Sequence, residues 1–360
     1  MTVTNPGIGL PGLPGRASQD DLLILDRTAV AQLLEGRGGD VLDAVRGAYC
    51  AHACGQDALP ESVFLGVPNG SRNRIIALPA YLSDSSPMAG LKWISSFPGN
   101  VASGLERASA LVILNSTETG RPIALMEGAL VSAQRTAASA ALAAKTLVNR
   151  EPATAAMIGC GFINFEVLRF LKLVFTSIRD VVIHDLLPDR AEMFLLRSKR
   201  EFPDLRVRTA GTWRELLHDS ELVSLATTAT VPYMDDLSMC ARGAVILHIS
   251  LRDLTPDAIL QAENLADDVD HVCRAQTSIH LTAVQTGSRS FLRGAIGDIL
   301  LGRLTPRQNA DSKIIFSPFG LGILDIAVAR LVYELALAQQ RGMRASNFFS
   351  PPPLACFAGE

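Results

Sequence analysis

The sequence has no run of about 18 uncharged apolar residues, the length that a membrane-spanning helix requires. The richest late stretch, Leu321–Ala338, is interrupted by charged residues at positions 325, 330 and 334. The opening stretch, MTVTNPGIGLPGLPGR, lacks a basic start and is broken by proline and glycine, which is poor for a signal peptide. We therefore expect no membrane association, and we expect residues 1–20 to form a flexible leader.

Cysteine is scarce, and no two cysteines form a CxxC pair. This scatter argues against a disulfide scaffold and a zinc site, and it fits a reducing cytoplasm. Histidine, cysteine and carboxylate residues form no cluster with ligand spacing, so we expect no metal. The six cysteines are Cys50, Cys54, Cys160, Cys240, Cys273 and Cys356.

An excess of charge of either sign is also missing, since 33 basic and 36 acidic residues give a net charge of −3. This balance gives no electrostatic reason to expect a nucleic-acid partner. Charged residues make up only 19% of the chain and apolar residues 48%, which indicates a globular protein with a buried subunit interface. A length of 360 residues suggests two domains.

The pattern of apolar residues changes along the chain. Residues 22–50 have helical spacing, whereas short β-rich runs and turns over residues 63–114 predict an antiparallel sheet or open barrel. A further strand, PIALMEG, precedes an alanine-rich helix over residues 130–148. Strand and helix patterns then alternate to about residue 315, which predicts an α/β fold with a Rossmann-type, doubly wound parallel sheet. Residues 320–340 are helical again.

The sharpest local motif is the loop Gly159-Cys160-Gly161, which follows an apolar strand and is expected to open a helix at Phe162 and Ile163. The first glycine permits a tight turn, and the second lets a pyrophosphate approach the helix N-terminus. Asn164 stands where glycine or alanine is usual, which predicts looser helix–strand packing. Cys160 is expected to be a small filler. The alternative is a purely structural glycine turn.

Asp185 ends the next predicted strand, 24 residues after Gly161. A carboxylate there accepts hydrogen bonds from the adenosine ribose hydroxyls and repels a 2′-phosphate, so we expect NAD rather than NADP. The alternative reading is a solvated aspartate.

Several further stretches resemble the ornithine cyclodeaminase/μ-crystallin family over about residues 60–340. They are GLKWISSFPGN, QRTAASAALAAK, HISLRDLTP and FSPFGLGILDIAVA. The resemblance is closest to the dehydrogenases that make 2,3-diaminopropionate for siderophores and peptide antibiotics. It implies a discontinuous α+β domain for substrate binding and dimerisation, over residues 21–148 and 317–360, and a Rossmann NAD-binding domain over residues 149–316. It also implies a homodimer.

That branch oxidises N-(1-amino-1-carboxy-2-ethyl)-glutamate with NAD and hydrolyses the imine to 2,3-diaminopropionate and 2-oxoglutarate. The substrate implied by the resemblance is thus a small amino-acid conjugate. It links the protein to a partner synthase, of the PLP-dependent kind, that makes the conjugate.

The resemblance implies that Lys92 and Arg135 hold a substrate carboxylate, with Lys92 counted among the catalytic residues. Arg135 also reaches the cofactor, and Thr136 donates to its pyrophosphate. Arg107 matches a position near the cofactor whose residue type varies. The alternatives are an exposed edge-strand lysine at 92 and a snorkelling surface arginine at 135.

Asp253 follows the apolar strand AVILHIS, and the resemblance makes it the acid/base residue near the substrate nitrogen. As an alternative it caps the next helix, although Thr255 is a better candidate for that cap. Thr227 and His248 are expected to line the cofactor, but a buried structural histidine is an equal alternative. Phe319 and Gly320 match the stretch that closes over nicotinamide and substrate, or else form a turn.

Relatives commonly carry another substrate-binding arginine before the LPAYL strand, and PESVFLG has none. Arg72 or Arg74 is expected to replace it, with Arg74 better placed beside the strand. A substrate with three carboxylates needs several cations.

Three alternative functions stay open at this point. Ornithine cyclodeamination is disfavoured because the loop DLTPDAIL differs from the glycine- and lysine-bearing form usual in that activity. An imino- or alanine-type dehydrogenase is a second alternative. A non-catalytic binding protein of the μ-crystallin kind is the third, against which Asp253, Lys92 and Arg135 argue.

Overall fold

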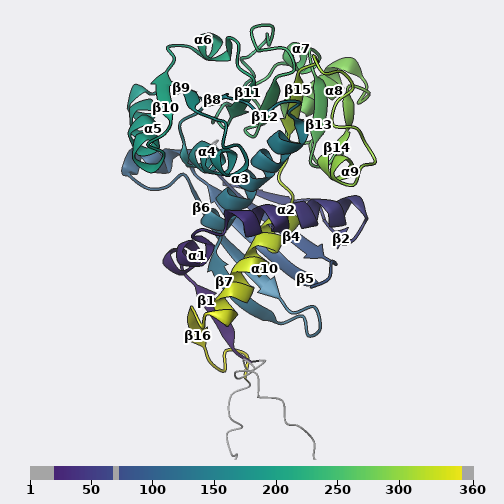
Figure 1. Ribbon diagram of the computed structural model, residues 1–360. Coiled ribbons are helices and arrows are strands. Elements are labelled where there is room, and N and C mark those ends of the chain that lie inside the picture. Colours follow the sequence, from purple (N-terminus) through teal and green to yellow (C-terminus); the bar gives the residue numbers. More distant parts are fainter. Residues whose placement is uncertain (1–19, 68–72, 351–360) are drawn as a thin grey trace, which may run out of the picture.

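The computed structural model describes residues 20–67 and 73–350, and this part of the chain forms two eight-stranded sheets (Figure 1). One sheet is built mainly from the N-terminal third and the other from residues 154–317. The expected α/β class with a Rossmann-type sheet is confirmed. The expected leader lies outside the described residues except for Asp20, and Arg72 and Cys356 lie outside them as well.

The N-terminal sheet is mixed, with the strand order β16-β1-β7-β6-β5-β4-β2 and with β3 paired to β4. The antiparallel sheet expected over residues 63–114 is confirmed by the ladders from β3 to β6. No pairing among the described residues joins β16 to β2, so the sheet is not a closed barrel. The strands are β1 (Leu22–Leu25), β2 (Asp57–Ala58), β3 (Val63–Gly66), β4 (Arg74–Leu82), β5 (Met88–Ser96), β6 (Ala108–Asn115), β7 (Pro122–Glu127) and β16 (Met343–Ala345).

The expectation of helix throughout residues 22–50 is partly wrong. Residues 22–25 form β1, which pairs in parallel with β7 and antiparallel with β16. A run of four apolar residues is too short to show a period, so strand pairing decides its conformation. Asp26 then caps α1 (Arg27–Leu34) by accepting from the Ala29 amide at 2.8 Å, and α2 (Gly38–Ala53) follows.

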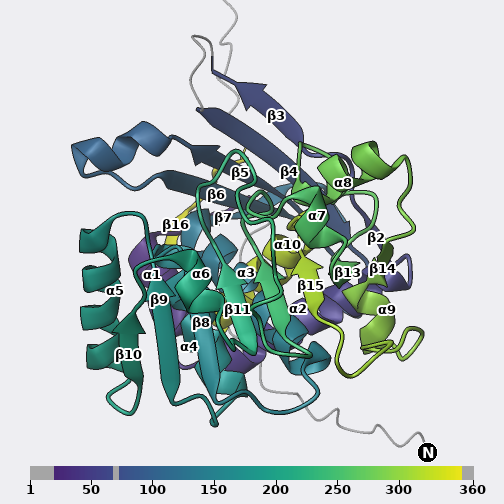
Figure 2. The same cartoon turned by 90° about the horizontal axis from the view of Figure 1, so that it is seen from above.

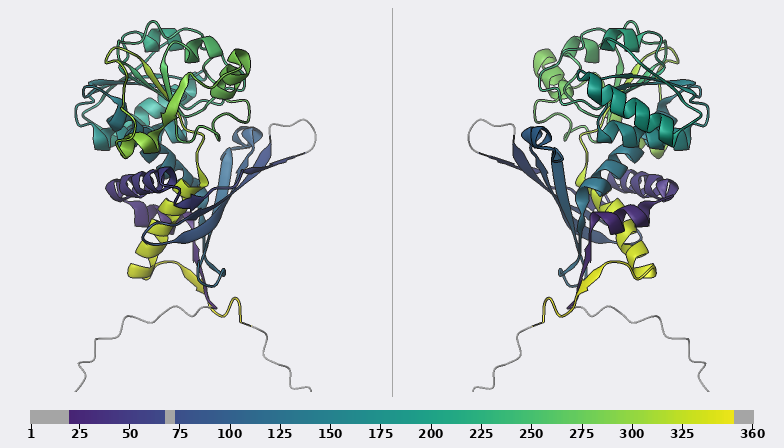
Figure 3. Two further views of the ribbon diagram at one scale, coloured as in Figure 1. Left: turned by 90° about the vertical axis from the view of Figure 1, so that its right-hand side faces the viewer. Right: turned by 90° about the vertical axis from the view of Figure 1, so that its left-hand side faces the viewer.

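Helices cover only one face of this sheet (Figure 3). Helix α10 (Gly322–Ala338) packs on β4, β5 and β6, beside α1, α2 and α3 (Gly128–Leu147). The opposite face carries Val63, Trp93 and Leu111, which share one cross-strand row and are 63%, 40% and 45% exposed. The helices of residues 20–67 and 73–350 therefore leave an apolar face of this sheet uncovered.

The second sheet is parallel throughout, with the order β10-β9-β8-β11-β12-β15-β13-β14 (Figure 2). The order reverses between β8 and β11, and ligands bind at such a switch point, beyond the carboxyl ends of the strands. The strands are β8 (Thr154–Ile158), β9 (Asp180–His184), β10 (Arg206–Thr209), β11 (Leu222–Leu225), β12 (Val245–His248), β13 (Glu263–Ala266), β14 (Leu292–Ala295) and β15 (Ile314–Ser317).

Short helices flank the parallel sheet. They are α4 (Phe162–Val174), α5 (Pro188–Glu201), α6 (Trp213–Leu217), α7 (Pro256–Ile259), α8 (Ser278–Thr286) and α9 (Ile296–Leu300), and a 3₁₀ turn η1 (Pro98–Ser103) precedes β6.

Helix α3 joins the two halves. It packs on α2, α10 and β6 on one side and on α4 and β12 on the other. Its small alanine side chains allow this close approach, and fourteen of its twenty residues are buried. No helix among the described residues is long and apolar enough to cross a membrane.

Candidate active site

The glycine loop lies at the switch point, between the end of β8 and the start of α4. Gly159 has φ +89°, and a Cβ there would lie 2.5 Å from the Ala226 carbonyl oxygen, so only glycine fits. Gly161 is the N-cap of α4, and a Cβ there would meet no atom within 4 Å. No side chain caps this helix, so its first amide groups face open space beside Gly161 and suit a pyrophosphate.

Asn164 does not loosen the loop as the sequence suggested. Its side chain is fully buried, and its amide nitrogen donates to the carbonyl oxygens of Ile158 at 3.0 Å and Gly159 at 2.8 Å. Its amide oxygen accepts from the Ser224 hydroxyl at 2.6 Å. Asn164 therefore ties α4 to β8 and β11 with hydrogen bonds where a small residue would rely on close packing.

Asp185 follows β9 and contacts the same loop. One carboxylate oxygen accepts from the Cys160 amide at 2.7 Å and the other from the Leu187 amide at 2.9 Å. This contact argues against a merely solvated aspartate. Burial, together with the Asp185 charge, raises the pKa of the Cys160 thiol to about 12, as expected of a small filler and not of a nucleophile.

Phe162 and Ile163 follow this loop directly at the start of α4, whereas contact of Arg107 and Thr136 with the cofactor stays a prediction. Ile163 is half-buried against the core, and Phe162 is 39% exposed with the Arg27 guanidinium 5.9 Å from its ring centre. Arg27 also pairs with Glu106 at 2.6 Å, which brings the neighbouring Arg107 to this side. Thr136 donates to the carbonyl oxygen of its own helix, at Ser132, at 2.7 Å.

Lys92 and Arg135 meet at a buried carboxylate that sequence reasoning did not single out. Lys92 Nζ donates to Asp325 Oδ2 at 2.7 Å, and Arg135 Nε donates to Asp325 Oδ1 at 3.1 Å. The three side chains come from β5, α3 and α10, and Asp325 is fully buried. Lys92 and Arg135 are 2% and 9% exposed, so neither is the surface residue of the alternative reading.

The charges in this group perturb one another. Burial, together with repulsion from Arg135, lowers the pKa of Lys92 to about 8 although Asp325 opposes the shift. Burial acts to raise the pKa of Asp325, but Arg135 and Lys92 outweigh it, and Asp325 remains ionised. Asp325 thus pairs with both Lys92 and Arg135, and its single negative charge leaves one positive charge of the group unbalanced. An anionic ligand can balance that charge.

Asp253 follows β12 and is fully buried. Its carboxylate accepts from the hydroxyl groups of Thr227 and Ser250. Burial acts to raise its pKa, but His248 and these two hydroxyls outweigh burial and lower it. An ionised carboxylate in this position can accept a proton or stabilise a cation. Thr255 caps α7 by accepting from Ala258 N at 3.3 Å, so Asp253 is not that cap.

His248 is fully buried behind Asp253 in this structure. Its Nε2 lies 3.2 Å from the Asp253 amide, which donates to it, and its Nδ1 lies 3.2 Å from the Ser317 hydroxyl. This arrangement fixes the ring behind the carboxylate. Contact of His248 with a cofactor stays a prediction.

Phe319 and Gly320 cross from β15 to α10 beside Arg135. Gly320 has φ +95°, and a Cβ there would lie 2.8 Å from Arg135 Nη1. Both amide groups donate to the buried carboxylate of Asp267, at 2.8 and 2.7 Å. Asp267 therefore holds this segment against Arg135.

Arg74 begins β4 and faces the same side of the sheet as Lys92. It pairs with Ser96, while Leu78, four positions further on, pairs with Lys92. Side chains alternate between faces along a strand, so Arg74 and Lys92 lie on one face, about 13 Å apart at ~3.3 Å per residue. The structure thus places Arg74 on the site side of the sheet.

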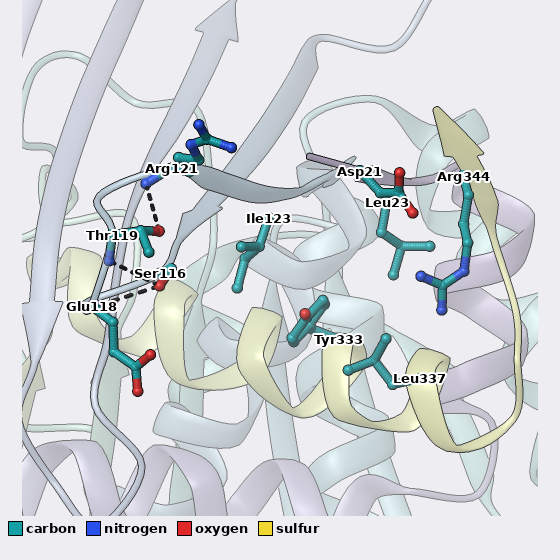
Figure 4. Close-up of a pocket in the computed structure, with 10 residues that line it drawn as sticks. All are labelled: Asp21, Leu23, Ser116, Glu118, Thr119, Arg121, Ile123, Tyr333, Leu337 and Arg344. Carbon is teal, nitrogen blue, oxygen red and sulfur yellow. Dashed lines mark hydrogen bonds between the residues drawn. The ribbon is translucent and has the colours of Figure 1, made fainter. Parts of the chain in front are cut away.

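One hollow of the molecule is remote from these residues. A hollow of about 190 Å³ lies beyond the far end of the N-terminal sheet, where Tyr333 and Leu337 of α10 point toward Leu23 and Ile123 (Figure 4). It contains none of the residues predicted for the site.

Within residues 20–67 and 73–350, no group of histidine, cysteine and carboxylate residues could hold a metal ion.

Sequence reasoning missed several polar residues of this region. The signal for Asp325 was present, because a carboxylate inside the apolar run GILDIAVA requires a buried partner. Asp267 and Ser250 carried no comparable signal, since their partners are distant backbone amides or a side chain fixed by a loop.

The model of the ornithine cyclodeaminase/mu-crystallin family matches residues 23–340. The chain is 29% identical over 328 residues to N-((2S)-2-amino-2-carboxyethyl)-L-glutamate dehydrogenase of Staphylococcus aureus, which covers 89% of this chain and 97% of that protein. It superposes with a TM-score of 0.83 and 25% identity on Δ(1)-pyrroline-2-carboxylate reductase of Thermococcus litoralis in complex with NADH and L-proline, covering 89% of this chain and 99% of that one. An archaeal alanine dehydrogenase dimer with bound NAD gives a TM-score of 0.80 and 28% identity, covering 91% of this chain and 99% of that one. The chain therefore belongs to the ornithine cyclodeaminase/mu-crystallin family.

Proposed function

We propose that this protein oxidises N-(1-amino-1-carboxy-2-ethyl)-glutamate with NAD and releases 2,3-diaminopropionate and 2-oxoglutarate. One observation carries this choice of substrate: the similarity to the Staphylococcus aureus dehydrogenase, which acts on a conjugate of this kind, extends over 89% of the chain. The arrangement of cations on one sheet and of Asp253 on the other supports the chemistry.

The chain is an NAD-dependent oxidoreductase that acts on a carbon–nitrogen bond. The glycine loop fits the cofactor, because Gly159 cannot carry a side chain and the space beside Gly161 is open to the first amide groups of α4. Asp185 would hold the adenosine ribose. Arg107, Thr136 and Thr227 would hold the remainder. When bound there, NAD would supply the hydride acceptor for oxidation at the glutamate α-carbon.

Asp253 carries the proton steps of this proposal. The protonated secondary amine of the substrate gives one proton to Asp253, which passes it on to solvent, and loss of the hydride from the neutral amine then forms a cationic carbon–nitrogen double bond, the iminium. Water then adds to that carbon, and the bond to nitrogen breaks to give a ketone and a primary amine. An ionised Asp253 accepts the proton of the attacking water and stabilises the cationic iminium.

Lys92 and Arg135 bind a substrate carboxylate beside Gly320. Asp325 balances only one of their two charges, so an incoming carboxylate completes the neutralisation of this buried group. Arg135 offers further N–H donors for a bidentate contact, since only its Nε is paired with Asp325.

The test is an assay with NAD and the glutamate conjugate that follows NADH and 2-oxoglutarate together. Equal amounts of both products are expected. Proline formed from ornithine without net NADH would instead show cyclodeamination. NADH formed from alanine but not from the conjugate would show an alanine-type dehydrogenase, and cofactor binding without turnover of any of these would show a binding protein.

The bare face of the N-terminal sheet supports a homodimer, in which the row Val63, Trp93 and Leu111 is buried against a second copy. In this proposal residues 21–148 and 317–360 bind substrate and dimerise, and residues 149–316 bind NAD. The product serves a siderophore or peptide-antibiotic route in the cytoplasm, downstream of a PLP-dependent synthase that supplies the conjugate. Trp93→Glu is expected to give a monomer in sedimentation.

A further inference from the structure

Arg252, which precedes Asp253 in the sequence, and Arg74, whose charge acts on Arg252, form no ion pair with a carboxylate among the described residues. Among the described residues Arg74 has no hydrogen-bond or ion-pair partner, and its Nε is buried and unpaired. Arg252 donates through Nη2 to the carbonyl oxygen of Ala275 at 2.6 Å, which is a neutral contact. Arg293, by contrast, is balanced by Glu263 at 2.5 Å.

The position of Arg252 is fixed by its loop. It stands between Leu251, which has φ +67°, and Asp253. The Leu251 carbonyl oxygen accepts from the Ser278 amide at 2.7 Å. Ala275, whose carbonyl oxygen accepts from the Arg252 side chain, has φ +52°. Left-handed conformations of residues other than glycine are unfavourable and persist where the surroundings impose them. The guanidinium is therefore held one residue from the proposed acid/base group.

The loop that anchors Arg252 also contacts the N-terminal sheet. Arg274, next to Ala275, pairs with Glu61 at 3.1 Å, just before β3. Strand β3 pairs with β4, and Gly66 stands opposite Arg74 in that ladder. This contact brings the Arg252 loop to the same edge of the sheet as Arg74.

The arginine charges act on one another at short range. Burial, together with the charge of Arg74, lowers the pKa of Arg252, and Asp253 opposes this shift. Burial, with the charges of Arg74 and Arg190, also lowers the pKa of Arg107. Arginines that repel one another and form no ion pair among the described residues create a site of positive potential for an anion.

We propose that Arg74 and Arg252 form a carboxylate subsite that binds the side-chain carboxylate of the glutamyl half of the substrate. The inference rests on the proposed function and extends it by assigning a second anion site besides Lys92 and Arg135. Planar guanidinium groups bind carboxylates through paired N–H donors, and two of them enclose one carboxylate from two sides.

This subsite selects among amino-acid substrates. Alanine and proline have no second carboxylate with which to fill it, and the side-chain ammonium of ornithine is repelled by the two arginines. Relatives commonly carry a substrate-binding arginine before the LPAYL strand, and this sequence has none there. In this proposal Arg252, together with Arg74, takes the place of that arginine. The selection acts on the substrate and not on NAD.

The test compares Arg74→Gln, Arg252→Gln and Arg252→Lys with the wild type and with Arg208→Gln, an exposed arginine of β10. With the conjugate, the KM of each glutamine variant should rise about tenfold to a hundredfold, as expected for loss of a charged hydrogen-bonding pair. The KM for NAD should stay constant, Arg252→Lys should recover part of the loss, and Arg208→Gln should behave as wild type. Thermal melting of each variant verifies the fold.

Unchanged KM values for the conjugate in both folded glutamine variants would overturn the subsite. An equal rise in the KM for NAD would also overturn it, because the arginines would then bind cofactor phosphates. Calorimetry with 2-oxoglutarate and pyruvate on the NADH-bound enzyme separates this inference from the proposed function. One outcome keeps the subsite and rejects the proposed substrate. In it, the wild type does not turn over the conjugate but binds 2-oxoglutarate more tightly than pyruvate, and the Arg252→Gln variant binds the two equally.

Discussion

The two sheets contribute different chemistry to the site. The N-terminal sheet and its helices supply cations, namely Lys92, Arg135, Arg74 and Arg107, whereas the parallel sheet supplies the glycine loop, Asp185, Asp253 and Asp267. In the proposed site the N-terminal side binds the substrate carboxylates and the parallel sheet binds most of the cofactor, which Arg107 and Thr136 reach from the N-terminal side. Arg252 is the exception, because it is a cation on the parallel sheet's side. Variants on the two sides should therefore change different quantities.

The largest effect is expected where the N-terminal side holds its cations. Asp325→Asn leaves Lys92 and Arg135 buried without a balancing charge, which should lower the free energy of unfolding by about 3–5 kcal/mol. Urea denaturation measures this loss. Glu151→Gln, which removes an exposed pair with Lys145, is the control and should change little. Equal stabilities of the two variants would mean that Asp325 does not hold the cations.

A chemical effect is expected on the parallel-sheet side. Asp253→Asn keeps the shape of the side chain but removes the base, so kcat should fall about a hundredfold while the Kd for NAD stays constant. Stopped-flow kinetics and calorimetry measure the two quantities. Asp257→Asn, at an exposed carboxylate on α7, should leave both unchanged. An Asp253→Asn enzyme with full kcat would remove Asp253 from the mechanism.

A smaller effect is expected at the glycine loop. Gly161→Ala should raise the Kd for NAD about tenfold without a change in Tm, because a Cβ meets no protein atom but occupies the space of the pyrophosphate. Gly159→Ala should lower Tm instead, since its Cβ would lie 2.5 Å from the Ala226 carbonyl oxygen. If Gly161→Ala binds NAD as tightly as the wild type, the pyrophosphate does not approach this loop.

The smallest effect is a pH dependence on the cation side. The pKa of Lys92 is about 8, lowered by burial and Arg135, so the lysine loses its charge as the pH rises through that value. The kcat/KM for the conjugate should therefore decline by a few-fold between pH 7.5 and 8.5, since only charged Lys92 binds a carboxylate. Lys92→Arg should lack this decline. A decline of the same size in the Lys92→Arg enzyme would assign it to another group.

The sequence predicted the parallel sheet, the glycine loop and the long helices because their signals are local periods and turn residues. It did not predict β1 or β16, whose three or four residues become strands only through pairing with distant partners. In the proposed site, Lys92, Arg135 and Asp253 were predicted from the motifs of the family resemblance. Asp267 and Arg252 were missed because their roles depend on backbone groups over 20 residues away.

Helix α3 gives the two sheets a common interior. One continuous cluster of buried apolar residues includes Leu82 and Val112 from the N-terminal sheet, Ala140 from α3, and Met157 and Leu247 from the parallel sheet. Two layers that share such an interior cannot lose their packing separately, so the chain is expected to unfold in one cooperative step. Because both sheets pack on this interior, the distance between the cations and the glycine loop is fixed. A ligand that spans them is therefore selected by its length as well as by its charge.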